Sequence, residues 1–168
     1  TSAPTSSLPS LPSAAAPAPA AGTTTTTTSP TSAIAAVAGA VPKIRVVTDV
    51  LDLDISLQGG DFIRADLLQY PRDKRPGSPP VRVFGTQEPD YSVARSGLRA
   101  LNGRPEPTHL ATFTSTANEF RLAPGATELR VPLSWNDGLG VTVTKTYVFR
   151  PGSYAIEVLY DVDNRSES

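Results

Sequence analysis

Hydrophobic and polar residues alternate with a period of two over several segments of the chain. The alternation is clearest from residue 51 to 57, where Asp52, Asp54 and Ser56 separate four aliphatic residues, Leu51, Leu53, Ile55 and Leu57. Successive side chains of a β-strand point to opposite faces, so this segment predicts a strand whose apolar face lies against a core. Gly59-Gly60 supplies the positive φ of a tight reversal, and residues 62–68 predict the returning strand. Residues 44–48 predict a short β-branched strand before the hairpin.

A second region of the same period lies further along the chain. Its first segment places four apolar residues in phase: Leu129, Val131, Leu133 and Trp135. The turn residues 136–140 and the Thr- and Val-rich residues 141–149 follow, which predicts a second hairpin. Pro151-Gly152 predicts another turn, and alternation resumes over residues 154–162, so we expect a meander of three strands.

The middle of the chain gives weaker signals. Residues 71–80 hold four prolines, one glycine and four charged residues, and they predict a surface loop. Residues 81–84, 91–94 and 109–113 are short strand candidates between Gly- and Pro-rich connections. No segment of twelve or more residues in the domain shows helical periodicity with caps, so the predicted class is all-β. A meander with one apolar face must bury it against a second sheet, which predicts an antiparallel β-sandwich.

Charge divides the chain of 168 residues into two parts. All 31 Lys, Arg, Asp and Glu residues lie at or after Lys43, where they make up roughly a quarter of the residues, an ordinary globular share. The preceding residues are uncharged and rich in Ala, Thr, Ser and Pro, and such small side chains bury too little apolar area to offset backbone entropy. We therefore expect a disordered linker over residues 1–42 and a folded domain over residues 43–168.

The sequence also bears on targeting. No Lys or Arg precedes Lys43, so no secretory signal peptide is visible, and residues 33–41 are too short and too rich in Ala to cross a bilayer. The chain starts at Thr1 without an initiator Met. We expect a processed chain or a piece of a longer protein, soluble by itself.

Composition excludes several kinds of chemistry. Without Cys the chain cannot form disulfide scaffolds, Cys-ligated zinc sites, iron–sulfur clusters or thiol nucleophiles. The single histidine, His109, excludes multi-His metal cages, and the formal net charge of −1 disfavours general nucleic-acid binding. His109 as a general base would need a nucleophile on a sharp turn, but the chain has no G-x-S-x-G, so a structural or surface histidine is favoured.

Two pairs of aspartates are candidate sites. Asp52 and Asp54 share one face of a predicted strand, about 7 Å apart, within the range of paired-carboxylate glycosidases. Alternating Asp is more typical of a solvated strand face. Asp161 and Asp163 beside Asn164 suggest calcium, but the glycine and distal Glu of a calcium loop are missing. Surface carboxylates are the favoured interpretation of both pairs.

The remaining candidates are also weak. Gly59-Gly60 lacks the Lys and the following helix of a phosphate loop, which favours simple turn glycines. Cationic side chains of residues 72–75 could attract phospholipid headgroups at about 1 kcal/mol each, but Asp73 and the neighbouring prolines favour plain solvation. Residues 164–166 match an N-glycosylation sequon, and the Thr run at residues 23–28 is compatible with an O-glycosylated stalk; both patterns have low specificity.

Four aromatic residues form a candidate sugar-stacking platform: Trp135, Tyr147, Tyr154 and Tyr160. Three of them, Trp135, Tyr154 and Tyr160, are in phase with aliphatic residues, which favours packing in the core. We therefore assign no catalytic, cofactor-binding or metal-binding residue from the sequence, and we expect no cofactor.

Three stretches in a fixed order carry a resemblance to a known family. The first runs from Thr48 through Gly59-Gly60-Asp61 to Pro71, and the second from Leu129 through the turn to Thr144-Lys145-Thr146-Tyr147-Val148-Phe149. The third, residues 152–164, fits the pattern G-x-Y-x-[IV]-x-V-x-Y-x-[IV]-x-N. Together they resemble the first periplasmic domain of the bacterial membrane protein insertase family YidC/Oxa. Residues 1–42 are similar to the variable linker that precedes this domain in the family.

The resemblance implies a mutarotase-like β-supersandwich on the periplasmic side of the bacterial inner membrane. It implies a membrane-embedded parent protein that inserts and folds membrane proteins, alone or with the Sec translocon and its SecD/SecF accessory. The first membrane helix, the second half of the ectodomain and the five-helix insertion region have no counterpart here, so no insertase functional residue can be carried over. The sandwich is then incomplete, and we expect an unpaired sheet edge or an exposed apolar face.

Two functions from different classes follow. The first is a non-catalytic docking or spacer module of the insertase. The alternative is a carbohydrate-binding or sugar-epimerising β-sandwich, which the aromatic residues and paired carboxylates motivate. A mutarotase needs a His and a Glu that converge on the sugar, and His109 is the only histidine, which weakens the epimerising form of this alternative.

Overall fold

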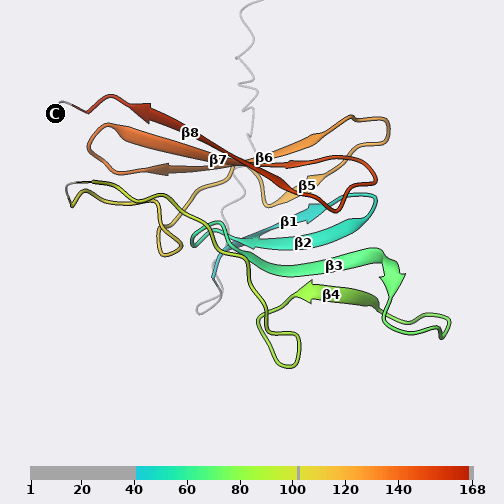
Figure 1. Cartoon of the computed structure of the whole chain (residues 1–168). Helices are drawn as coiled ribbons and strands as arrows, with labels where there is room; N and C mark the ends of the chain where they lie inside the picture. The colour runs from blue at the N-terminus through green and yellow to red at the C-terminus, as the bar shows by residue number, and fades with distance from the viewer. Residues whose placement is uncertain (1–40, 102, 167–168) are drawn as a thin grey trace, which may run out of the picture. The chain divides into compact units, whose positions relative to one another are not determined.

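The computed structural model describes residues 41–101 and 103–166, and within them the chain forms eight β-strands and no helix (Figure 1). The strands are β1 (Lys43–Val47), β2 (Leu51–Ser56), β3 (Phe62–Pro71), β4 (Pro80–Phe84), β5 (Glu119–Arg121), β6 (Leu129–Asn136), β7 (Val141–Phe149) and β8 (Glu157–Asn164). No described segment is a helix that could cross a membrane. The linker expected over residues 1–42 lies outside the described residues except for its last two positions.

Five strands form the first sheet, in the order β4-β3-β2-β1-β5. Strands β1 to β4 pair antiparallel with their sequence neighbours, and β5 joins β1 in parallel, with Glu119 opposite Arg45. The register places Leu53 between Val46 of β1 and Ala65 of β3, and all three side chains are buried. The predicted apolar face of β2 is therefore confirmed.

Strands β6, β7 and β8 form the second sheet, an antiparallel meander in that order, as predicted. Lys145 of β7 lies opposite Leu133 of β6 and Tyr160 of β8. No other described strand pairs with the outer edge of β8. Two inner-face side chains of this edge strand, Val158 and Val162, are 37% and 53% exposed.

The two sheets lie one above the other in Figure 1. Both contribute side chains to one hydrophobic core, so the all-β sandwich is confirmed. The core members from the first sheet include Ile44, Val46, Leu51, Leu53, Ile55, Phe62 and Ala65, and those from the second are Val131, Leu133, Tyr147 and Phe149. Phe113, from the long connection between β4 and β5, is also buried there. In β2, β6 and β7 the inner residues recur every second position, because each sheet turns one face to the core. In β3 a register shift places the inner residues Phe62 and Ala65 three positions apart.

The structure differs from the sequence predictions in the middle of the chain and at β8. The strand candidates at residues 91–94 and 109–113 make only isolated bridges, including the pairing of Ala94 with Phe62. Strand β5 was not predicted, because its three residues carry one apolar side chain. Strand β8 begins at Glu157, so Tyr154 lies in the preceding turn region; its side chain is 36% exposed, and its predicted place in the core was wrong.

Candidate functional site

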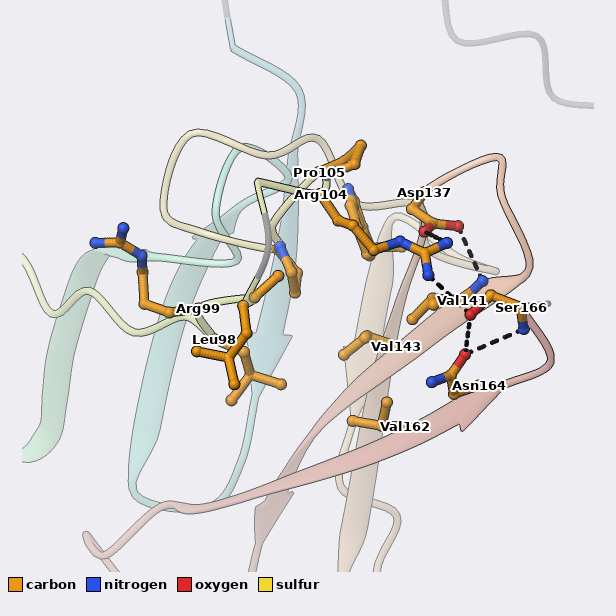
Figure 2. Close-up of a pocket in the computed structure, with 14 residues that line it drawn as sticks. Leu98, Arg99, Arg104, Pro105, Asp137, Val141, Val143, Val162, Asn164 and Ser166 are labelled. Carbon is orange, nitrogen blue, oxygen red and sulfur yellow. Dashed lines mark hydrogen bonds and ion pairs between the residues drawn. The ribbon is translucent and has the colours of Figure 1, made fainter. Parts of the chain in front are cut away.

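A cavity of about 460 Å³ lies beside the inner face of the second sheet (Figure 2). One side of it is formed by side chains of the sheet, namely Trp135, Val141, Val143 and Val162. The other side comes from the long connection between β4 and β5, including Leu98 and Arg104. We call residues 95–101 of this connection the strap. Most of the lining side chains from the sheet are apolar, which suits this site to an apolar or amphipathic ligand.

Polar groups gather at one end of the cavity around Arg104. Its Nη1 donates to Ser166 Oγ (2.8 Å), and its Nη2 donates to Asp137 Oδ2 (3.4 Å) and to the Leu139 carbonyl (3.3 Å). Burial opposes ionisation of Asp137, but backbone N–H groups of Val141 and Leu139 outweigh it, so the pKa of this carboxyl lies below its ordinary value. These groups bind one another, and they close the end of the cavity with a neutral cluster.

The paired aspartates of β2 belong to an ion-pair network on the outer face of the first sheet. At its centre, Arg64 of β3 binds Asp52 (2.7 Å), Asp54 (3.0 Å) and Asp66 (2.6 Å). Three further cations complete the network: Arg45 on Asp52, Lys43 on Asp54 and Arg82 on Asp66. Asp54 is only 6% exposed, so the predicted solvated face was wrong for this residue. Cross-strand registry, which the alternation does not specify, brings the cations over the carboxylates.

This network is unsuited to glycoside hydrolysis. A paired-carboxylate glycosidase needs one carboxylic acid with a raised pKa, which stays protonated near neutral pH. Here the hydrogen bond from Arg45, assisted by Arg64, lowers the pKa of Asp52 to about 2. The pKa of Asp54 is also lowered, because Arg64 and Lys43 outweigh the effect of burial. Both groups are therefore carboxylate anions at neutral pH.

His109 and Asp61 line a second cavity, of about 500 Å³, together with Arg95. Burial raises the pKa of Asp61, against the opposing charges of Lys145, Arg95 and His109. Its Oδ1 has no hydrogen-bond partner among the described residues, and its Oδ2 lies 3.5 Å from Arg95 Nε. Among the described residues, no hydrogen bond joins His109 to a carboxylate. The pairing that would orient a catalytic histidine is therefore not formed here.

The four aromatic residues do not form one platform. Tyr147 is buried in the core, Trp135 lines the cavity of Figure 2, and the Tyr160 hydroxyl donates to Ser96 Oγ (3.0 Å). Tyr154 packs instead on Tyr70, with ring centroids 5.6 Å apart. A platform built from these four rings would need them together on one exposed face. The arrangement therefore gives the carbohydrate alternative no support.

The predicted turn glycines are confirmed. Gly59 and Gly60 have φ of +74° and +67°, which L side chains rarely adopt. A Cβ on Gly59 would lie 2.5 Å from the His109 carbonyl oxygen, and one on Gly60 would lie 3.1 Å from Lys145 Nζ. The turn thus needs glycine for its backbone conformation and for close packing.

The remaining charged candidates are bound to neighbouring charges. Arg72 pairs with Asp90, Arg75 with Asp73, and Asp163 with Arg165. Among residues 41–101 and 103–166 no three His, Asp or Glu side chains gather as metal ligands. The loop of residues 72–75 is thus largely neutralised within the domain, in line with plain solvation.

Sequence reasoning missed Lys145, which is fully buried. Its Nζ donates to the carbonyl oxygens of Gly59 (2.9 Å), Gly60 (3.3 Å) and Ser96 (3.3 Å). The only signal in the sequence is that Lys145 is in phase with the inner-face residues Val143 and Tyr147. A charged residue at an inward position of a strand is rare, and it marks a special local environment.

Comparison with known proteins agrees with the predicted resemblance. The family model described as YidC periplasmic domain matches residues 43–168. The membrane protein insertase YidC of Methylococcus capsulatus is 47% identical over 126 residues, which cover 75% of this chain and 23% of that relative. The protein of the same name from Thioalkalivibrio sulfidiphilus is 47% identical over 131 residues, covering 74% of this chain and 23% of that relative.

A third relative, the membrane protein insertase YidC of Nitrosococcus oceani, is 36% identical over 125 residues, covering 74% of this chain and 23% of its own length. The chain thus spans less than a quarter of the relatives it matches. The family match covers both sheets and every described strand. The chain belongs to the YidC periplasmic domain family, and it lies on the periplasmic side of the bacterial inner membrane.

Proposed function

We propose that this chain is a non-catalytic docking or spacer module of a membrane protein insertase, which inserts and folds integral membrane proteins in the inner membrane. The observation that carries the proposal is the family match over residues 43–168, together with relatives named as membrane protein insertases. The activity and its nascent membrane-protein substrates belong to the whole protein. For this chain they are a proposal, since it spans 23% of each of these relatives.

The chemistry of the described residues supports a non-catalytic role. The carboxylates of the outer face are ion-paired, with the pKa of Asp52 lowered to about 2. The polar groups of the cavity in Figure 2 bind one another around Arg104. General acid–base catalysis needs a group whose pKa lies near the working pH and which can reach the substrate. Lys145 has such a pKa, but it is fully buried.

For partners, we propose the Sec translocon and its SecD/SecF accessory, on the strength of the family resemblance. A domain with a formal net charge of −1 does not attract partners by long-range electrostatics. Its contacts would therefore be local and specific. Docking and spacing make different predictions, because a spacer can be replaced by any folded domain of similar size.

Co-purification from membranes tests this proposal. The parent insertase would be compared with a variant that lacks residues 43–168 and with one in which an unrelated β-sandwich of similar size replaces them. We expect both variants to insert a Sec-independent substrate normally and to retain much less Sec translocon. Undiminished Sec association in both would overturn docking. If the variant with the unrelated β-sandwich retains Sec association while the deletion variant loses it, the domain is a spacer.

A further inference from the structure

Lys145 joins two segments that are far apart in the sequence. Its ammonium donates to Gly59 and Gly60 of the β2–β3 turn and to Ser96 of the strap. An ammonium carries three N–H donors, and here all three find backbone carbonyl oxygens. Each contact is charge-assisted; the two to Gly59 and Gly60 are buried and the one to Ser96 is part-buried, so the buried pair is stronger than the same contacts on the surface.

Aromatic rings enclose the same ammonium. The ring centroids of Tyr147, Phe113 and Tyr160 lie 5.2, 5.9 and 5.9 Å from Nζ. Rings at this distance attract a cation through their negative faces. The acidic group whose charge acts on Lys145 is Asp61, which follows the turn and makes no direct ion pair with Lys145 in the described structure. The site is therefore built around the positive charge by carbonyls and rings.

Beyond Ser96 the strap forms part of the wall of the cavity in Figure 2, through Leu98, Arg99, Ala100 and Leu101. The strap makes several other contacts. Arg95 lies 3.5 Å from Asp61, the Tyr160 hydroxyl donates to Ser96 Oγ, and the Leu98 N–H donates to the Pro107 carbonyl (3.1 Å). Glu106 pairs with Arg99 (2.9 Å) and accepts from the Ala100 N–H (3.1 Å). Among the charged side chains that contact the strap, Lys145 is the fully buried one.

We propose that Lys145 is a positioning residue whose ammonium holds the strap against the double-glycine turn and so keeps the cavity wall in place. The proposal goes beyond docking or spacing, because it assigns control of access to the cavity to a buried group on β7. The strap then covers the cavity, and the contact with Lys145 on its core-facing side holds it in place. Methionine fills a similar volume but donates to none of the three carbonyls, and glutamine supplies two donors without charge.

Hydrogen exchange of the 168-residue chain tests the fastening directly. In Lys145→Met we expect amides of residues 95–101 to exchange about tenfold faster than in the wild type, since a lost hydrogen bond to a charged group shifts an opening equilibrium by about this factor. Peptides from β2 should change much less. Lys43→Met is the matched control, because it removes a lysine that is half exposed on the outer face.

A second readout reports on the cavity itself. Trp135 is the only tryptophan and lines the cavity, so acrylamide should quench its fluorescence more strongly in Lys145→Met than in the wild type or Lys43→Met. If Lys145→Met does not fold, Lys145→Gln takes its place, with a smaller rise expected. The proposal is overturned if the amides of residues 95–101 exchange at the wild-type rate in Lys145→Met. It is also overturned if their exchange rate increases only as much as that of the β2 peptides. Unchanged quenching of Trp135 would overturn it as well.

Discussion

Tyr160 lies directly opposite Lys145 in the β7–β8 register, and its ring centroid is 5.9 Å from the Lys145 ammonium. Both side chains also reach Ser96, Lys145 through the backbone carbonyl and Tyr160 through the hydroxyl group. Two neighbouring strands of one sheet thus hold the same residue of the strap. Burial of the ammonium lowers the pKa of Lys145 from its ordinary 10.5 to about 8, against the opposing charge of Asp61.

This lowered pKa predicts an alkaline rise in stability. Between about pH 8 and 10 the folded chain has released the Lys145 proton while the unfolded chain still holds it, so the free energy of unfolding increases with pH. Urea denaturation at pH 7, 8, 9 and 10 measures this increase. Lys145→Met should remove it, and Lys43→Met should keep it. The same pH dependence in wild type and Lys145→Met would contradict the assignment.

Asp52 predicts a second window, in acid, in which the free energy of unfolding also rises with pH. Its pKa is lowered from 3.8 to about 2, mainly by Arg45, so the unfolded chain takes up this proton before the folded chain does. The contribution of Asp52 is fully present above about pH 4 and is lost as the pH falls through 2. Thermal unfolding between pH 2 and 5 should therefore show a shallower slope for Asp52→Asn than for the wild type. Asp163→Asn, in an exposed pair, is the control; an equal effect of both variants would refute the special role of Asp52.

Arg64 should matter more to stability than any single exposed arginine. Arg64→Met removes the shared partner of three carboxylates, two of them in buried aspartates, and we expect a loss of about 3 kcal/mol in the free energy of unfolding. Arg75→Met, at a side chain that is 86% exposed, should cause little change. Equal urea midpoints for the two variants would show that the network contributes no more than surface pairs do.

The double-glycine turn permits a matched pair of substitutions. Gly59→Ala places a methyl group 2.5 Å from a backbone oxygen at positive φ, whereas Gly77→Ala has a similar φ of +79° with no atom within 4 Å. Gly77→Ala should cost only the conformational term of about 1–2 kcal/mol. Gly59→Ala should lower the free energy of unfolding by at least twice as much. Equal losses in denaturant titrations would mean that the close approach of residue 109 does not constrain the turn.

The sequence predicts a strand of this fold when the strand's own residues determine it, and fails when pairing with a distant strand determines it. Strands β2, β6 and β7 followed from alternation, because a sheet that buries one face requires a period of two. Strand β5 did not, since its three residues become a strand only by pairing in parallel with β1. The position of Tyr154 was also missed, because the pattern continues past the turn while the strand begins at Glu157.

The candidate sites were predictable to different degrees. The turn role of Gly59 and Gly60 could be seen from residue type alone, since glycine has the required backbone freedom. The pairing of Asp54 with Arg64 could not, because it depends on the register between β2 and β3. Lys145 needed the tertiary structure, since its carbonyl partners lie 49 to 86 residues away.

Of the two proposed roles, docking rather than spacing predicts direct contact between this domain and Sec components. Photo-crosslinking within the intact insertase in cells tests it most directly, with a photoreactive residue at exposed Tyr70, Tyr91 or Leu110, and at buried Tyr147 as the control. Docking predicts adducts to Sec components from at least one exposed position and none from Tyr147. Exposed positions that yield no adduct to any Sec component would contradict it.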